Sequence, residues 1–572
     1  MLRTAVSWMG ISSLLVAAAC SDSTGPKPPP LLPECTAGRG FAVSLAVDSF
    51  VSIDPVPDSG CVLFPANAGV DTVEYLVVPQ SATGVPGLSA PFLLRGDTVH
   101  PPMAALSASA APLSPVERFH MFLREGERTH WYGFAPQSQR APARFPALLQ
   151  TGPPDSGSTR SFSLCAKLDC SSFKTVTATA KVVRGHIALY VDNLAPANGL
   201  NQADLDTIAD TFNNRLYPLD TTAFGRESDI DNNTVVIVLM TNAVNQLVSA
   251  SQCLSSGFVT GFFFAADIDP QFANDSRVNH GEIFYSMVAD PSQTLSCSHS
   301  RTEVKRLAPI TFVHEFQHMI SFNRHVLVGG GEAEALWLNE GLSHLAEDLG
   351  GRSYLPGTAK DSLTFRDFVF GDFQDAYQYL DEQGSHFLLA TAGIGTLAER
   401  GAMWLFVRFI TDQSRTDTSF AATAAFTRKL EETMLTGADN VATQTGVRFD
   451  SLVARWALAT WVSDLPGFTA PSTLKYTSWD LRARFAAFHT DPMTSGAFPK
   501  PFPLVPTAGA GNLTALSGTL LSGSGRYHRA FQAPGTAGFQ LQFAGYGRIL
   551  FAQYLAVPPA AVVPRLAIIR IR

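Results

Sequence analysis

The chain lacks the features of several large protein classes. Only 16% of its residues are charged, the net charge is −8, and no basic stripe is present, so a nucleic-acid partner is not expected. No hydrophobic stretch after residue 20 is long enough to cross a bilayer, and no internal repeat is visible. Cysteine is scarce, at 7 in 572 residues, and no C-x-x-C occurs, which argues against a zinc cluster built on thiolates.

Residues 1–20 have the pattern of a secretory signal peptide. One positive charge precedes a short apolar run, and small residues lead to Cys20. Residues 15–20 resemble a bacterial lipobox, in which Cys20 becomes the lipidated N-terminus; a plain signal peptide cleaved nearby is the alternative. Because Ser21 rather than Asp follows Cys20, we expect an exported lipoprotein of the bacterial cell envelope, anchored in the outer membrane.

The other cysteines are even in number once Cys20 is lipidated, as expected of an exported chain. They are clustered along the sequence, which favours pairing between neighbours. Three disulfides are predicted: Cys35–Cys61, Cys165–Cys170 and Cys253–Cys297.

Composition divides the rest of the chain into an α+β catalytic unit with a β module on either side. Residues 21–33 are polar and then proline-rich, and they are predicted to tether the body to the membrane. Residues 34–100 alternate β-branched runs with turn residues, which indicates an all-β module. Residues 101–160 are interpreted as a linker or pro-segment-like arm. Residues 161–475 form the predicted catalytic domain and residues 476–572 a C-terminal β-sandwich module.

The catalytic unit is expected to combine a mixed sheet with a helical lobe. Its strands are predicted over residues 175–183, 186–191, 234–241 and 281–288. Helices are predicted over residues 114–128 in the arm, and over 201–216, 381–392, 397–413, 418–434 and 449–462 in the catalytic unit.

His314, Glu315 and His318 form an H-E-x-x-H motif, the strongest chemical signal in the chain. On an α-helix, residues i and i+4 share one face, so both imidazoles can bind one metal ion. Zinc in a catalytic site keeps one position for water, and Glu315 is placed to take a proton from that water. The flanking residues are apolar, and buried His and Glu side chains need a partner that a metal supplies. The alternative is a surface helix with two unrelated histidines.

A third zinc ligand is needed, and the downstream residues leave several candidates. Ser321 and Arg324 stand where the metzincin pattern has Gly and His, and His325 is one residue late and expected to be exposed. The candidate carboxylates are Glu332, Glu334, Glu340 and Glu347. Glu340 is favoured because its neighbours are apolar and helical, whereas the two glutamates before it follow a glycine turn and are expected to be solvated.

H-E-F-Q-H-M-I followed by W-L-N-E-G-L-S-H-L-A-E resembles the gluzincin metallopeptidases, in particular the hyicolysin-type family of secreted bacterial neutral metallopeptidases. The match is specific over residues 310–350 and does not extend to either end of the chain. The resemblance implies that His314, His318 and Glu340 bind one Zn²⁺ ion and that Glu315 is the general base. It also implies that the substrate is a protein or peptide.

Two features of related gluzincins are missing. Aminopeptidase-like members carry a Tyr three residues before a Gly-Ala pair to polarise the scissile carbonyl, and Ala398 takes that position here. Substitutes for this oxyanion stabiliser are expected at Tyr377, Tyr379 or His386; losing such a donor typically costs about 10²–10³ in rate. The G-x-M-E-N segment that holds a free substrate amine is also absent, which favours an endopeptidase.

In gluzincins an edge strand beside the zinc pairs with extended substrate. By that resemblance, we assign the substrate edge strand to Glu282, Ile283, Phe284 and Tyr285.

Residues 229–233 have the D-x-D-x-N spacing of some calcium loops. Thr234 and Met240 stand where an EF-hand needs Gly and Glu, so this is no EF-hand. A tight turn before the next strand is the favoured interpretation, and Ca²⁺ binding is the alternative.

Two classes of function fit these patterns. The first is a zinc endopeptidase on an exported, lipid-anchored chain. The second is a catalytically weak or inactive gluzincin-like lipoprotein that binds protein or polysaccharide through its β modules, for which Ala398 is the argument. Glu315 favours the first, because inactive homologues of enzymes usually lose the base or a ligand. A zinc-dependent hydrolase of another bond is a third option.

Overall fold

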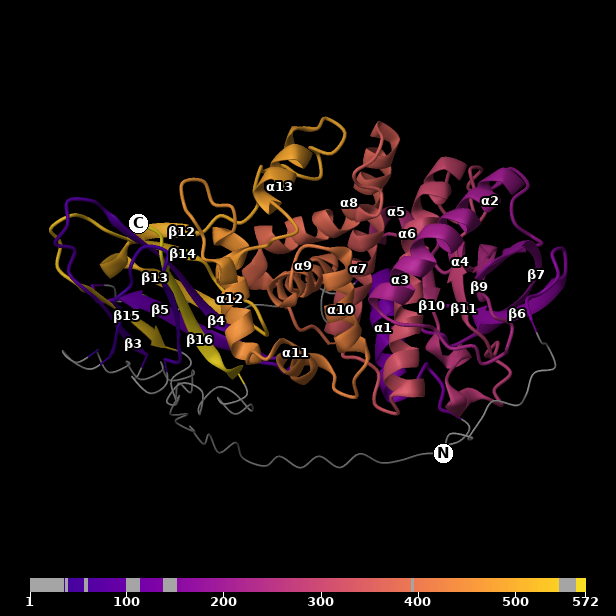
Figure 1. The fold of residues 1–572 in the computed structure, drawn as a ribbon, viewed down its shortest axis with the longest axis horizontal. Coiled ribbons are helices and arrows are strands. Elements are labelled where there is room, and N and C mark those ends of the chain that lie inside the picture. The colour runs from indigo at the N-terminus through magenta and orange to yellow at the C-terminus, as the bar shows by residue number, and fades with distance from the viewer. Residues whose placement is uncertain are drawn as a thin grey trace, which may run out of the picture. The chain divides into compact units, whose positions relative to one another are not determined.

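The computed structural model describes residues 35, 40–55, 60–98, 114–136, 152–391, 396–544 and 562–572. Cys35–Arg572 form one compact unit, drawn as a ribbon in Figure 1. The predicted lipidation site Cys20, the signal peptide and the tether lie outside the described residues and stay predictions. Within the described ranges, no helix is both long and apolar enough to cross a membrane.

The described chain is a mixed α+β protein with three mixed sheets, as the sequence predicts at the level of fold class. The sheet of the catalytic unit has the order β10-β11-β9-β8-β7-β6. Its strands are β6 (Thr159–Cys165), β7 (Phe173–Arg184), β8 (Ile187–Asp192), β9 (Val236–Met240), β10 (Gly261–Phe263) and β11 (Ile283–Ser286). The pairs β11–β9 and β9–β8 are parallel, and the other pairs are antiparallel. Every residue of the central strand β9 is buried, which places this sheet in the core.

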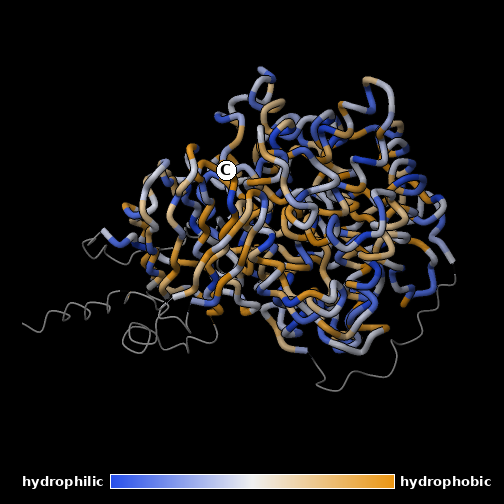
Figure 2. Tube along the Cα trace, turned by 60° about the vertical axis from the view of Figure 1, so that its left-hand side comes forward, coloured by the Kyte–Doolittle hydropathy of each residue, from blue (hydrophilic) through white to orange (hydrophobic). Residues whose placement is uncertain are grey.

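Helices make up most of the remaining catalytic unit. The α-helices are α1 (Pro115–Thr129), α2 (Gln202–Thr211), α3 (Tyr217–Ala223), α4 (Asn242–Asn245), α5 (Ala250–Ser256), α6 (Arg301–Phe322), α7 (Leu336–Arg352), α8 (Ala359–Asp381), α9 (Leu397–Ser414), α10 (Phe420–Glu431), α11 (Gly437–Thr445), α12 (Phe449–Val462) and α13 (Leu481–Thr490). Helix α6 contacts β10 and β11, and α7 packs against α6, α8 and α9. Figure 2 shows hydrophobic stretches through the interior of these elements, while hydrophilic stretches lie mainly at the periphery.

The helix predicted over residues 381–392 is wrong. Helix α8 ends at Asp381, and a short 3₁₀ turn over Gln383–Ser385 follows it. The apolar residues Phe365, Phe368 and Phe373 of α8 are buried. The helix in this part of the chain therefore lies before residues 381–392. The prediction over residues 449–462 matches α12.

The two ends of the chain form one β-sandwich rather than two separate modules. The first sheet has the order β1-β3-β15-β5-β13, and the second has the order β12-β14-β4-β16-β2. The strands are β1 (Phe41–Ala42), β2 (Phe50–Ile53), β3 (Cys61–Phe64), β4 (Val73–Ser81), β5 (Ser89–Gly96), β12 (Thr507–Ala510), β13 (Ala515–Leu521), β14 (His528–Gln532), β15 (Phe539–Ala544) and β16 (Pro564–Arg570). Indigo strands from the first hundred residues therefore lie between yellow strands from the last seventy in Figure 1.

Packing between the two sheets explains this arrangement. The Phe64 ring stacks on Phe539 at 4.3 Å within the first sheet and meets Tyr75 of the second sheet edge-on at 4.9 Å. Strands β2, β4 and β5 have strand neighbours only from the C-terminal end of the chain, so the sheets that bury these rings need both ends. Arg565 of β16 donates a 2.6 Å hydrogen bond to Asp450 of α12, which ties the sandwich to the helices.

The three predicted disulfide pairings are confirmed. Cys35–Cys61, Cys165–Cys170 and Cys253–Cys297 are each joined, with sequence separations of 26, 5 and 44 residues. Disulfides of this kind are typical of proteins that fold in an oxidising compartment.

Helix α1 lies in the core of the catalytic unit, although the sequence analysis placed it in a linker or pro-segment-like arm. A capping box between Ser114 and Glu117 starts the helix. Phe119 is fully buried and meets Phe262 of β10 edge-on at 5.1 Å. Helix α1 also contacts α7, so its side chains are available to the region around the H-E-x-x-H motif.

Candidate metal centre

Helix α6 presents the H-E-x-x-H residues inside the protein. A capping box between Ser300 and Glu303 starts the helix, and its residues from Thr311 to Phe322 are all buried. His314 and His318 are one turn apart on the same face, and their Nε2 atoms lie 3.1 Å from each other. Sequence periodicity predicted this placement.

Helix α7 brings Glu340 to the two histidines. Glu340 Oε2 lies 3.7 Å from His314 Nε2, and Glu340 Oε1 lies 3.7 Å from His318 Nε2. The next residue, Gly341, allows α9 to approach closely, because a Cβ there would lie 2.6 Å from Val407 and 3.0 Å from the Met403 carbonyl oxygen. The glycine of W-L-N-E-G therefore serves the packing of the ligand helix against α9.

The separation of the two Nε2 atoms, and the distance from each of them to the nearer Glu340 oxygen, fit one tetrahedral zinc ion. Ligands about 2.0–2.1 Å from a tetrahedral ion lie about 3.3 Å apart, close to the observed separations of 3.1 to 3.7 Å. Glu340 is fully buried, and neither of its carboxylate oxygens has a hydrogen-bond partner among the described residues. A buried carboxylate without partners is costly, so a cation between these side chains satisfies all three.

A second grouping, made of His314, His344 and Glu347, could also hold a metal ion. His314 Nδ1 and Glu347 Oε1 are only 2.7 Å apart, which is short for two ligands of one ion and normal for a hydrogen bond. We therefore interpret Glu347 as the partner that orients His314 rather than as a metal ligand.

Each histidine of the motif donates its Nδ1 proton to an oxygen of α7. His314 donates to Glu347 at 2.7 Å, and His318 donates to the side-chain oxygen of Asn339 at 2.8 Å. The two Nε2 atoms face each other, and a neutral ring whose proton is on Nδ1 offers its Nε2 lone pair to a shared metal ion. Burial lowers the pKa of His318 well below its usual value, which keeps that ring neutral.

Charges around Glu340 keep its carboxyl ionised. Burial opposes ionisation, but opposing charge, above all that of the Arg400 guanidinium, outweighs it and lowers the pKa of Glu340 well below its usual value. The pKa of Glu347 is lowered as well. Burial raises it, but hydrogen bonds from His314 and His344 outweigh burial and lower it to about 2. Both carboxylates are therefore charged near neutral pH.

Glu315 is held by the edge of the sheet. The Phe263 backbone N–H of β10 donates a 2.7 Å hydrogen bond to Glu315 Oε2. Burial raises the pKa of Glu315, and the positive charge of Arg124 acts against this rise. The carboxylate is thus fixed next to the first histidine of the motif and is a stronger base than an exposed glutamate.

The predicted substrate edge strand is wrong. Ile283, Phe284 and Tyr285 belong to β11, which is paired on both sides, with β10 and with β9. Glu282 is buried beside Ser228 and Ile230, away from a sheet edge. The edge strand next to β11 is β10, and β6 forms the opposite edge; the three residues of β10 are too few to show a period-2 pattern in sequence.

A cavity of about 390 Å³ opens next to the metal centre. Its walls include His314 and Glu315 of α6, His344 and Glu347 of α7, His120 of α1 and Arg400 of α9. The Arg400 side chain is almost fully buried, its Nε lies 3.9 Å from Glu340 Oε2, and its Nε and Nη2 have no hydrogen-bond partner among the described residues.

The three predicted oxyanion stabilisers lie elsewhere. The Tyr377 hydroxyl accepts a hydrogen bond from the Lys500 backbone, and Tyr379 stacks on Trp456. His386 lies 3.1 Å from Glu399. None of the three lines the cavity beside Glu315. Arg400, two residues after Ala398, faces it instead.

Several residues near the two histidines belong to no recognisable sequence motif. Arg124 and Glu127 of α1 form a buried ion pair at 2.9 Å, and Asn339 donates to Glu127 at 3.0 Å, which connects α1 to His318. Arg124 and Glu127 lie on the buried face of an amphipathic helix, and charged residues in such a position are the sequence signal that could have indicated them. His325 and Glu334, expected to be exposed, are buried 3.7 Å apart.

Comparisons with protein-family models and curated proteins found no match for this chain. The geometry itself establishes a buried group of His and Glu side chains that could hold a metal ion.

Proposed function

We propose that the chain is an exported, lipid-anchored zinc endopeptidase of the gluzincin type, similar to the hyicolysin-type family. One observation carries the proposal: His314, His318 and Glu340 converge in a buried cluster, and Glu315 lines the adjoining cavity. Three protein ligands with a neighbouring carboxylate match the requirements of a catalytic zinc site. The disulfides agree with export, and the lipid anchor rests on Cys20 and its neighbours.

The proposed chemistry divides between the metal and the protein. A zinc ion bound by the three ligands supplies Lewis-acid chemistry, because it acidifies water and polarises a carbonyl group. Glu315 accepts the proton of the attacking water and passes it to the leaving amine. The Phe263 N–H keeps the Glu315 carboxylate in place, and the raised pKa of Glu315 makes the carboxylate an effective proton acceptor near neutral pH.

Arg400 is our candidate for the group that stabilises the scissile carbonyl oxygen. It lines the cavity, its Nε lies 3.9 Å from Glu340 Oε2, and two of its nitrogens have free donors. A guanidinium remains charged at all physiological pH values, so it can replace the tyrosine that Ala398 removes.

An extended peptide is the substrate that fits this cavity best. Strand β10 is one edge of the sheet, and Gly257, Phe258 and Thr260 just before it line the cavity together with Glu315. Glu315 and Arg124 occupy the Phe263 backbone groups, so a peptide added as a further strand would lie along the residues before Phe263 and use main-chain hydrogen bonds, which tolerate many side chains. This supports cleavage within protein chains.

Hydrolysis of unfolded casein by the full chain tests the proposal. Wild-type protein loaded with zinc is expected to cleave casein, to lose activity with a chelator and to recover with added zinc. Glu315→Gln should retain one zinc ion per chain and lose about 10²–10⁴ in kcat. The matched control is Glu332→Gln, which makes the same change at an exposed position. If zinc-loaded Glu315→Gln cleaves casein like wild type, the proposed mechanism is wrong.

A further inference from the structure

Three carboxylates from two separate segments of the sequence, both of which precede the H-E-x-x-H motif, meet at one end of the catalytic sheet. Asp229 and Asp231 lie in the loop before β9, and Glu282 immediately precedes β11. Because β9 and β11 are parallel neighbours, their first residues lie at the same end of the sheet. One carboxylate oxygen from each of the three residues lies within 4.8 Å of the others.

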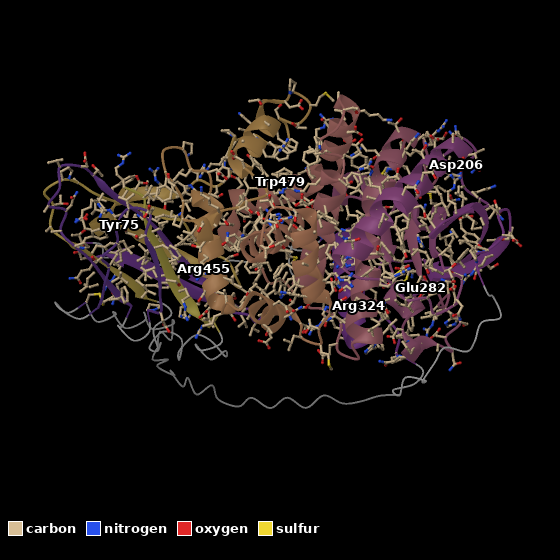
Figure 3. The ribbon with its side chains drawn as sticks, viewed as in Figure 1. Tyr75, Asp206, Glu282, Arg324, Arg455 and Trp479 are labelled. Atoms are coloured by element: carbon tan, nitrogen blue, oxygen red, sulfur yellow. A yellow bond between two sulfur atoms is a disulfide. The ribbon has the colours of Figure 1, made fainter. Side chains whose placement is uncertain are left out.

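Glu282 shows that this is more than a surface cluster of acids. Its side chain is 1% exposed, and Figure 3 labels it among the side chains around the sheet. One oxygen, Oε1, accepts hydrogen bonds from the Ser228 hydroxyl at 2.5 Å and the Ile230 N–H at 2.9 Å. The other oxygen, Oε2, is buried and has no hydrogen-bond partner among the described residues, a condition that costs free energy unless a ligand satisfies it.

Asp231 is held by a neutral neighbour, and the nearby cation Arg160 is bound elsewhere as well. Asp231 is buried, and its carboxylate accepts hydrogen bonds from Asn233, which is neutral. Arg160 acts electrostatically on Asp231, but its Nη2 donates to the backbone oxygen of Asn279 at 2.7 Å. The Arg160 guanidinium is therefore shared between Asp231 and that backbone oxygen.

A glycine allows the two segments to come together. Gly281 immediately precedes Glu282, and a Cβ on it would lie 2.7 Å from Asp231 Oδ2. A side chain at this position would push Asp231 away from the cluster.

We propose that Asp229, Asp231 and Glu282 bind one Ca²⁺ ion at a site separate from the His314–Glu340 centre. Calcium takes six to eight oxygen ligands at about 2.3–2.6 Å, so its carboxylate oxygens lie up to about 4.8 Å apart. The three side chains meet this condition, and further oxygen ligands such as water would complete the shell. The missing Gly and Glu of an EF-hand do not count against this site, because its third carboxylate comes from the residue before β11 rather than from the loop before β9.

The proposed ion would join the loop before β9 to the start of β11. Strand β11 pairs with β10, whose Phe263 N–H holds Glu315. Calcium is therefore expected to stabilise the sheet beneath the metal centre, since a ligand that binds only the folded state raises its stability.

Calorimetric titration of the full, zinc-loaded chain with CaCl₂ tests this proposal. Wild type should bind one Ca²⁺ per chain, and its unfolding temperature should rise with CaCl₂ concentration. Glu282→Gln keeps an acceptor for Ser228 and Ile230 but loses the charge, so its Kd for Ca²⁺ should rise at least about tenfold. Asp229→Asn changes an exposed residue and should have the same effect in a protein that folds normally.

Two controls separate this site from other effects. Asp206→Asn removes a carboxylate that is paired with Arg184 on the surface and is labelled apart from Glu282 in Figure 3; its Kd should be unchanged. Glu340→Ala should also bind Ca²⁺ like wild type. The proposal is overturned if wild type binds no Ca²⁺ at about 1 mM, if Glu282→Gln and Asp229→Asn both bind like wild type, or if Glu340→Ala abolishes binding.

Discussion

Replacement of Glu347 by Gln should weaken zinc binding although Glu347 is not a zinc ligand in our account. Glu347 Oε1 lies 2.7 Å from His314 Nδ1 and 3.3 Å from His344 Nδ1. Its pKa is about 2 because these hydrogen bonds outweigh burial, so it carries a full negative charge at pH 7. That charge orients the His314 ring and makes its Nε2 a better ligand.

The expected size of the effect follows from the role of such partners. Loss of a carboxylate that orients a metal-binding histidine typically costs about 10–100-fold in metal affinity, which corresponds to about 1.4–2.7 kcal/mol. Glu347→Gln keeps the size of the side chain and an oxygen acceptor, so the change isolates the charge.

Competition between the protein and a fluorescent zinc chelator at pH 7 measures this difference. Glu332→Gln is the matched control because Glu332 is exposed, and its zinc affinity should equal that of wild type. An unchanged affinity in folded Glu347→Gln would refute the reasoning. A complete loss of zinc, beyond about 1,000-fold, would instead indicate that Glu347 is a direct ligand.

Three further predictions concern the carbonyl donor and the stability of the fold. Arg400→Gln should lower kcat by about 10²–10³ with KM little changed and zinc content intact; an unaltered kcat would exclude Arg400 as the donor. Asp450 accepts hydrogen bonds from Arg448 and Arg565, which outweigh burial and lower its pKa to about 2. Asp450→Asn should therefore cost about 1 kcal/mol in the free energy of unfolding at pH 7 after allowance for screening. Because the folded pKa is depressed, this difference should disappear as pH falls from about 4 to about 2, and a constant difference in acid denaturation would contradict it. Loss of the Cys35–Cys61 disulfide, which spans 26 residues, should cost about 3.5 kcal/mol, compared with about 2 kcal/mol for Cys165–Cys170; urea unfolding of the double-serine variants tests this order.

Local geometry explains which parts of the site the sequence could predict. His314 and His318 are four residues apart in a helix, so their side chains must share a face. Glu340 was favoured because its neighbours are apolar, and it is fully buried 3.7 Å from both histidines. The Cys165–Cys170 disulfide could be predicted for a similar reason, because its two cysteines are only 5 residues apart in sequence.

Long-range packing explains what the sequence analysis missed. Strand β4 pairs with β16 and β14, from the other end of the chain, and a strand's own pattern does not identify its partner. The edge strand β10 has three residues, fewer than a periodic signal needs. Helix α9, which carries Arg400, packs closely against Gly341 of W-L-N-E-G, but that motif does not show which helix will pack there.

The zinc content of purified protein tests the central claim most directly. We predict one zinc ion per chain in wild type and in the exposed control Glu332→Ala, and a large loss of zinc in folded Glu340→Ala, because Glu340 completes the ligand set with His314 and His318. Stoichiometric zinc in Glu340→Ala, or none in wild type purified with zinc present, would contradict the account.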